Sequence, residues 1–127
     1  MLIYKEFTFE AAHFLPSAEK GTANSRIHGH SFRVRVTLKG APDDDTGLIL
    51  HLGTVEEKLK IVQGKLDHRF LNEDVPGLEI PTLEHIALWI WGELHHELPL
   101  IYEVSVMRDS CGEGCIYRGS QHNKDVI

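Results

Sequence analysis

The fold is decided by one stretch of the chain, residues 27–39, which reads Ile-His-Gly-His-Ser-Phe-Arg-Val-Arg-Val-Thr-Leu-Lys. From His28 onward, every second side chain is either apolar or an imidazole, and from Ser31 onward the side chains between them are polar. The first face consists of His28, His30, Phe32, Val34, Val36 and Leu38. The opposite face carries Ser31, Arg33, Arg35, Thr37 and Lys39. Alternation of this kind indicates a β-strand with one buried face.

Residues 2–13 show the same alternation and predict a second strand. With the exception of Lys5, the odd positions form its apolar face, which ends in a histidine. These positions are Ile3, Phe7, Phe9, Ala11 and His13. If the two strands pair antiparallel, the end of the first lies beside the start of the second. His13, His28 and His30 then converge at one end of the sheet, since alternate strand residues share a face about 7 Å apart.

Three imidazoles on one buried face suggest a metal site. Three protein ligands with a fourth position open to water or substrate form the catalytic zinc arrangement, whereas structural zinc sites are closed by four ligands. The alternative is that each histidine is an ordinary core residue satisfied by its own hydrogen bonds. Burying three imidazoles without a shared purpose is costly, which favours the metal.

Two helices and two further strands complete the expected fold. Residues 54–57 fit a capping box at the start of a first helix, and Pro81-Thr82 opens a second. Alternation at 101–109 and a short strand at 115–118 follow. The order strand, strand, helix, helix, strand, strand predicts an α+β domain, in which a four-stranded antiparallel sheet carries both helices on one face. Two open sheet edges in so small a domain favour an oligomer.

Composition narrows the class of protein. The chain has 127 residues, 13 Lys and Arg against 19 Asp and Glu, and a net charge of −6, which argues against nucleic acid as the main partner. No apolar run is long enough for a membrane helix, and the N-terminus does not resemble a signal peptide. Two cysteines are too few for a disulfide framework, so we expect a cytoplasmic protein.

Five motifs together resemble the 6-pyruvoyl-tetrahydropterin synthase family, and within it the bacterial 6-carboxy-tetrahydropterin synthase branch that feeds queuosine synthesis. They are FEAAH at 9–13, RIHGHS at 26–31, LDHRFLN at 66–72, PTLE at 81–84 and CIYRG at 115–119. The resemblance extends over residues 2–119. We therefore expect one domain at 1–119 and a C-terminal tail at 120–127.

This resemblance implies the tunnelling fold (T-fold), in which sheets from several subunits close into a barrel, usually as a homohexamer with active sites between subunits. It implies one Zn²⁺ per subunit on His13, His28 and His30. The implied activity is a lyase reaction on dihydroneopterin triphosphate, a pterin.

The resemblance also implies roles for four further residues. Asp67 and His68 match the pair that completes proton transfer from a neighbouring subunit. Asp109 matches a glutamate that accepts the guanine-like edge of the pterin ring. Thr82 matches a residue near the same ring, and its position also predicts a helix N-cap.

Three residues depart from the family pattern. Asn24 occupies the position of the cysteine base, and an amide cannot act as a general base. His51 stands where the family usually has an aspartate, and Asp109 is one methylene shorter than glutamate. The substitute base is then Glu19, followed in order by His68 and His51, with Ser25 also possible if it has a base of its own. The alternative function is a zinc-binding T-fold paralogue that binds a pterin or a metal without the synthase reaction.

Overall fold

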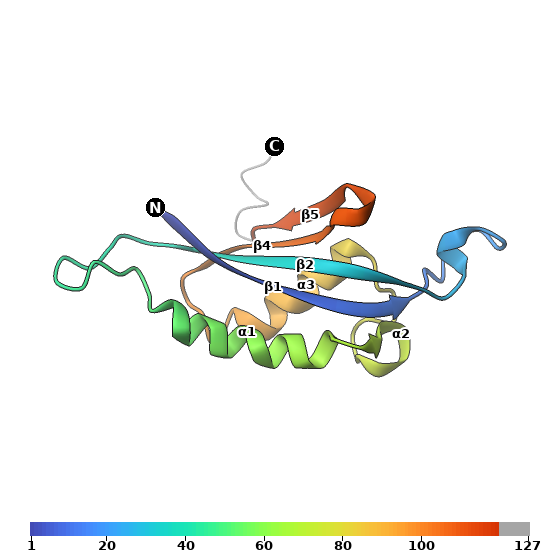
Figure 1. The fold of residues 1–127 in the computed structure, drawn as a ribbon, viewed down its shortest axis with the longest axis horizontal. Coiled ribbons are helices and arrows are strands. Elements are labelled where there is room, and N and C mark those ends of the chain that lie inside the picture. Colours follow the sequence, from blue (N-terminus) through green and yellow to red (C-terminus); the bar gives the residue numbers. More distant parts are fainter. Residues whose placement is uncertain (120–127) are drawn as a thin grey trace.

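A five-stranded sheet with two long helices against one face forms the domain in the computed structural model, which describes residues 1–119 (Figure 1). The expected tail at 120–127 lies outside the described residues. The strands are β1 (Leu2–His13), β2 (His28–Lys39), β3 (Arg69–Phe70), β4 (Ile101–Arg108) and β5 (Glu113–Tyr117). The α-helices are α1 (Leu52–Leu66), α2 (Leu71–Asp74) and α3 (Leu83–Leu94), and two 3₁₀ turns span Ala23–Ser25 and Asp109–Cys111.

The α+β class and the helix placement are confirmed, but the expectation of a four-stranded, purely antiparallel sheet was wrong. The strand order is β3-β1-β2-β4-β5, and β3 runs parallel to β1. β3 follows shortly after α1 in the chain and has only two residues, which pair with Ala11 and Ala12. Two residues are too few to produce an alternating pattern, so the sequence carries no periodic signal for this strand.

The core lies between the sheet and the two long helices. Phe9 of β1 and Phe32 of β2 stack with ring centroids 4.7 Å apart, and both are 1% exposed. The helices contribute apolar side chains at helical spacing. These are Val55, Leu59, Val62 and Leu66 of α1 and Leu83, Ile86, Ala87, Ile90 and Leu94 of α3. The buried face of β2 is therefore the face that the alternation predicted.

The helix starts show one wrong prediction and one confirmed prediction. The N-cap of α1 is His51, three residues before Thr54, the cap expected from the capping box at 54–57, because the His51 ring accepts a hydrogen bond from the Gly53 backbone N–H at 3.1 Å. Thr82 is the N-cap of α3, and its hydroxyl accepts from the His85 backbone N–H at 3.1 Å. Within residues 1–119, no helix is both long and apolar enough to cross a membrane.

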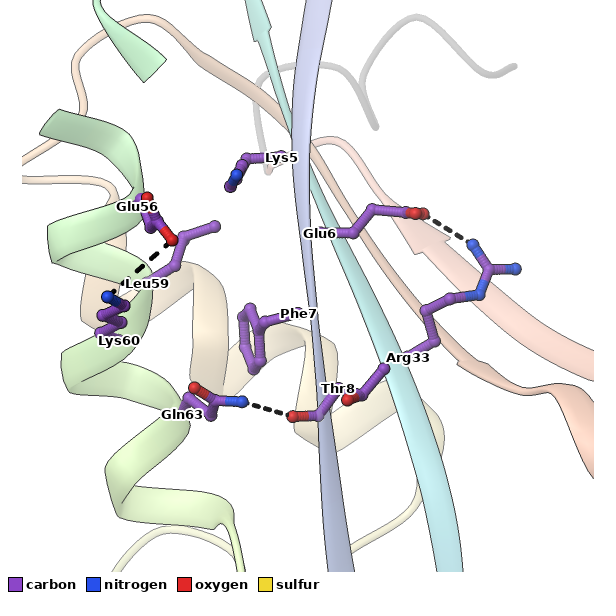
Figure 2. A pocket seen from close by; sticks show the side chains of 9 residues that line it. All are labelled: Lys5, Glu6, Phe7, Thr8, Arg33, Glu56, Leu59, Lys60 and Gln63. Atoms are coloured by element: carbon purple, nitrogen blue, oxygen red, sulfur yellow. Dashed lines mark hydrogen bonds and ion pairs between the residues drawn. The ribbon is translucent and has the colours of Figure 1, made fainter. Parts of the chain in front are cut away.

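Most of the β1 edge is not covered by another strand. β3 pairs only with Ala11 and Ala12, and residues 5–8 of β1 border a hollow of about 400 Å³ between β1 and α1 (Figure 2). The Gln63 side chain reaches across this hollow and donates to the Thr8 carbonyl at 2.7 Å. At the other end of the sheet, β5 is the second edge strand. The domain thus presents two open edges, as the sequence predicted.

Candidate metal centre

The pairing of β1 with β2 brings the three predicted histidines together. His13 lies opposite His28, and Ala11 lies opposite His30, so all three imidazoles extend from one face of adjacent strands. Their ring centroids are 4.6 to 5.1 Å apart. One nitrogen from each ring lies within 4.8 Å of the others. Three nitrogens at this spacing could hold a single metal ion.

Hydrogen bonds to the backbone orient two of the rings toward their shared centre. His13 Nδ1 lies 2.9 Å from the Pro81 carbonyl oxygen, and His28 Nδ1 lies 2.7 Å from the Arg26 carbonyl oxygen. A carbonyl can only accept, so Nδ1 of each ring carries the proton and Nε2 keeps its lone pair. A histidine that binds a metal commonly donates its other ring N–H in this way.

His13 Nε2 is buried and has no hydrogen-bond partner among the described residues. A buried imidazole nitrogen without a partner is destabilising, and native proteins rarely leave one. A metal ion would satisfy this lone pair, and the donor set of three imidazoles suits Zn²⁺. The residues therefore fit the metal that the resemblance implies.

Burial keeps the cluster in its metal-binding protonation state. The pKa of His13 is lowered to about 4, chiefly by desolvation and also by the charges of His28, His30 and Arg108, although the Pro81 hydrogen bond partly opposes this shift. Desolvation also lowers the pKa of His30, with Arg108 as the next cause. Both rings are therefore neutral near pH 7, the form in which imidazole binds a metal.

Asp67 and His68 lie directly after α1 and interact with each other. One Asp67 oxygen accepts the Glu10 backbone N–H at 2.9 Å, and the other lies 3.1 Å from His68 Nδ1. The Glu10 hydrogen bond is the main reason that the Asp67 pKa is lowered, so this carboxylate is ionised. The His68 side chain is 80% exposed, and its backbone has a left-handed φ of 60°.

His68 is not part of the cluster formed by the three histidines of its own chain. It lines an open pocket of about 530 Å³ that also includes Glu10, His30 and Ser31. In one chain, the structure thus brings together His13, His28 and His30 as a possible metal site, and places His68 at an open pocket that borders His30.

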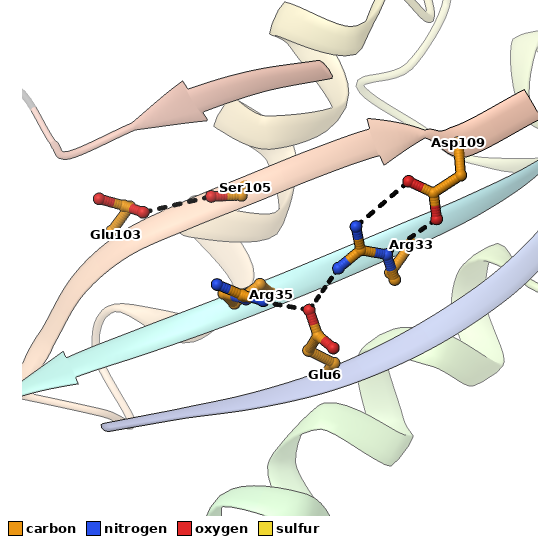
Figure 3. Close-up of polar contacts among 6 residues, drawn as sticks. All are labelled: Glu6, Arg33, Arg35, Glu103, Ser105 and Asp109. Carbon is orange, nitrogen blue, oxygen red and sulfur yellow. Dashed lines mark hydrogen bonds and ion pairs between the residues drawn. The ribbon is translucent and has the colours of Figure 1, made fainter. Parts of the chain in front are cut away.

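Asp109 lies on the same face as Glu6, away from the helices, where it is held by Arg33 (Figure 3). Arg33 donates to both Asp109 oxygens, at 2.8 and 3.2 Å, and also to Glu6 at 2.6 Å. Arg35 donates to the same Glu6 oxygen at 2.9 Å. The Arg33 hydrogen bonds lower the Asp109 pKa, so Asp109 is an ionised acceptor at neutral pH.

The other residues predicted for the site lie beside Pro81, on the loop after His13, or at the start of α1. Thr82 directly follows Pro81, whose carbonyl orients His13. Glu19 lies on the exposed loop that follows His13. Asn24 and Ser25 lie in the 3₁₀ turn of this loop, where the Asn24 backbone carbonyl accepts from the Leu15 N–H at 2.8 Å. His51 caps the start of α1, and α1 starts at the opposite end of the sheet from the end of β1, where the cluster lies (Figure 1).

Sequence reasoning missed one charged residue beside the cluster, Arg108. It is the last residue of β4, its side chain is only 14% exposed, and its charge lowers the pKa of both His13 and His30. The signal was present, because Arg108 continues the alternation of the buried Val104 and Val106. An arginine in phase with two buried valines points into the core face rather than into solvent.

Comparison with known proteins places the chain in a family. The family model described as 6-pyruvoyl tetrahydropterin synthase matches residues 2–120. A 6-carboxy-5,6,7,8-tetrahydropterin synthase from Synechocystis sp. is 39% identical over 122 residues, which cover 91% of this chain and 92% of that protein. The chain belongs to the 6-pyruvoyl tetrahydropterin synthase family.

Other members of the 6-pyruvoyl tetrahydropterin synthase family agree with this assignment. A 6-carboxy-5,6,7,8-tetrahydropterin synthase from Bacillus subtilis is 31% identical over 125 residues, covering 90% of this chain and 82% of that protein. The structure of Caenorhabditis elegans 6-pyruvoyl tetrahydropterin synthase superposes with a TM-score of 0.82 at 25% identity, covering 94% of this chain and 96% of that one. The expected T-fold is therefore confirmed.

The buried His13 predicts how the stability of the metal-free protein depends on pH. Its pKa falls from 6.5 to about 4 on folding, so the unfolded chain binds more protons between these values. The free energy of unfolding should therefore decrease as pH falls through this window, by up to about 3 kcal/mol from His13 alone.

Urea unfolding of chelator-treated protein at pH 7 and pH 4.5 measures the change. The His13→Gln variant is the control, because the share of the pH dependence due to His13 should vanish in it. An equal loss in both proteins would contradict the prediction.

Proposed function

We propose that the protein is a zinc-dependent lyase of the 6-carboxy-tetrahydropterin synthase type. Its substrate is dihydroneopterin triphosphate or a related pterin, and its pathway is the synthesis of queuosine and other 7-deazapurines. The observation that carries the proposal is the cluster of His13, His28 and His30, with the buried, unpartnered nitrogen of His13, in a chain of this family. The names of the Synechocystis and Bacillus relatives support the reaction class.

In this proposal the histidine triad binds one Zn²⁺ per subunit. When bound, zinc acts as a Lewis acid that lowers the pKa of substrate hydroxyl groups and so eases their deprotonation. The protein supplies neutral ligands, because burial holds the pKa of His13 and His30 below the usual value. It also fixes two of the rings through the Pro81 and Arg26 carbonyls.

Asp67 and His68 transfer protons in this proposal, and they do so in the site of a neighbouring subunit. Two observations support the exchange between subunits. His68 is exposed, and it is not one of the histidines whose nitrogens cluster within 4.8 Å in its own chain. Asp67 holds the imidazole through Nδ1, which leaves Nε2 of His68 directed away and available for proton transfer.

Asp109 and Thr82 bind the pterin ring in this proposal. The ionised Asp109 carboxylate can accept two N–H groups from the guanine-like edge of the ring. Both of its oxygens contact Arg33 in the free chain, so ring binding must exchange the Arg33 hydrogen bonds for hydrogen bonds from the ligand. Thr82 lies next to Pro81, which places it near the metal ligand His13.

Glu19 is our first choice for the base that replaces the family cysteine, with His68 second and His51 third. Glu19 lies on the exposed loop between His13 and His28, which starts at the metal centre and is long enough to fold over it. His51 is the weakest choice, because its ring nitrogen already accepts the Gly53 N–H at the start of α1. Ser25 donates to the Thr22 carbonyl at 2.7 Å, and no base for it is described.

We also propose a cytoplasmic homo-oligomer, with a hexamer as the assembly that the family resemblance implies. The open edges of β1 and β5 support assembly, because pairing one with the other in a neighbouring copy removes both. Two free cysteines are consistent with a reducing compartment. The small-molecule pterin is the only ligand besides the metal that the proposal needs.

A second candidate function is a paralogue that binds zinc and a pterin without catalysing the synthase reaction. The specific observation that favours it is Asn24, since the position of the family base holds a neutral amide. The metal centre would be the same in both cases. Turnover therefore separates the two candidates, and metal content does not.

The metal proposal predicts one zinc per chain. Changing His28 and His30 to Ala together should reduce the zinc content to background, because a single imidazole cannot hold the ion against a chelator. Inductively coupled plasma mass spectrometry on dialysed protein gives the stoichiometry. His96→Ala, an exposed histidine on another part of the surface, is the matched control and should keep full zinc. Full zinc in the double variant would exclude this site.

The assembly proposal predicts a mass of several chains by light scattering at micromolar concentration. Even-numbered residues of β1 direct their backbone groups to the open edge, as the Thr8 and Glu10 hydrogen bonds show. Tyr4→Pro removes one N–H from this edge, and proline is tolerated on edge strands, so the variant should fold but dissociate. A compact monomer for the unaltered protein would contradict assembly and any active site shared between subunits.

The activity proposal predicts slow but measurable conversion of dihydroneopterin triphosphate by the zinc-loaded protein. Loss of a well-placed base typically costs about 10²–10⁴-fold in rate, so Asn24→Cys should raise turnover while zinc content stays constant. Asn24→Ser is the control, because serine is similar in size to cysteine but has no thiol that can ionise. Glu19→Gln should lower the turnover that remains. If both the native protein and Asn24→Cys are inert while loaded with zinc and assembled, the non-catalytic paralogue is the function.

A further inference from the structure

Arg108 lies beside the histidine triad on the buried face of the sheet. In the β2–β4 pairing, Arg33 lies opposite Met107, and continuing this register by one residue places Arg108 across from Phe32. The Phe32 ring contacts both His13 and His30, with centroids 5.9 and 5.7 Å apart. Arg108 is therefore one row of the sheet away from the proposed metal ligands.

The charge of Arg108 is only partly compensated within the described chain. One terminal nitrogen forms an ion pair with Glu113 at 2.7 Å, while its buried Nε has no hydrogen-bond partner. The Glu113 side chain is about half exposed, so solvent weakens its effect. A guanidinium with one ion-pair partner and a buried, unsatisfied Nε–H is expensive to keep, which calls for a reason beyond packing.

The electrostatic influence of Arg108 reaches the triad itself. The Arg108 side chain extends from the same face as the triad, in the row of Phe32, whose ring contacts both His13 and His30. A positive charge at this position disfavours a divalent cation bound to these rings, since the two repel each other. The same field attracts an anion in the metal's open position, where it adds to the charge of the metal.

We propose that Arg108 is a positioning residue that weakens metal binding by the triad and strengthens binding of an anionic oxygen to the metal-loaded site. The ligand class is an oxyanion, either a carboxylate or a deprotonated hydroxyl of the substrate. Glu113 moderates the effect by neutralising part of the guanidinium charge. This inference rests on the metal site of the proposed function and adds to it a residue that sets its ligand preference.

The test compares metal affinity and anion affinity in the same variants. Arg108→Gln should bind Zn²⁺ at least threefold more tightly in a chelator competition, and Glu113→Gln should bind it at least threefold more weakly. In Co²⁺-loaded protein, acetate titrated against the visible absorption spectrum should bind at least threefold more weakly to Arg108→Gln. Arg108→Lys, which keeps the charge, should restore both affinities toward those of the unaltered protein.

Opposite changes in the two affinities distinguish this role from structural damage, because a distorted site loses both together. Arg35→Gln is the matched control, since it removes a cation from the other face of the sheet and should change each affinity less than twofold. Weaker binding of both Zn²⁺ and acetate in Arg108→Gln, or no change in either, would overturn the proposal. If Arg108→Gln does not fold, an unchanged Zn²⁺ affinity in Glu113→Gln would overturn it equally. A native protein that binds no Zn²⁺ would instead refute the proposed metal site itself.

Discussion

The antiparallel register between β1 and β2 is the constraint on which the rest of the structure depends. It places His13 opposite His28 and, in the same alternation, Phe9 opposite Phe32. One face of this pair is therefore both the wall of the core and the support of the histidine cluster. A slip of one residue would move every side chain of one strand to the opposite face, exposing the core and separating the histidines together. The stability of the fold and the geometry of the candidate site consequently depend on the same strand register.

The features that the sequence predicted are those with a strong periodic signal. The span of β1, residues 2–13, was predicted with its bounds, and β2 was predicted to within one residue, because twelve alternating residues leave little choice of face. Convergence of the three histidines follows from the same alternation. The features that sequence reasoning missed depend on contacts that leave no periodic trace. β3 is two residues long, and α1 starts where an imidazole, an uncommon cap, accepts a backbone hydrogen bond.

The charged side chains were harder to predict than the apolar ones. Asp109 could be placed by its likeness to a family position, but its two hydrogen bonds to Arg33 depend on residues 76 positions apart in the sequence. Arg108 and Asp109 are neighbours in the chain, yet one lies beside the histidines and the other lies on the opposite face with Glu6. The local sequence shows which residues are charged, but the pairing of the strands determines on which face of the sheet each charge lies.

If the proposed metal binds, the unpartnered nitrogen of His13 links metal supply to the lifetime of the folded protein. A ligand that binds only the native state adds to its stability in proportion to the logarithm of its free concentration, about 2.7 kcal/mol at a hundred times the dissociation constant. Metal-starved molecules would keep the buried nitrogen unsatisfied and unfold more often, which exposes them to proteolysis. The steady-state abundance of this protein would then follow the availability of the ion, without any dedicated sensor or change in gene expression.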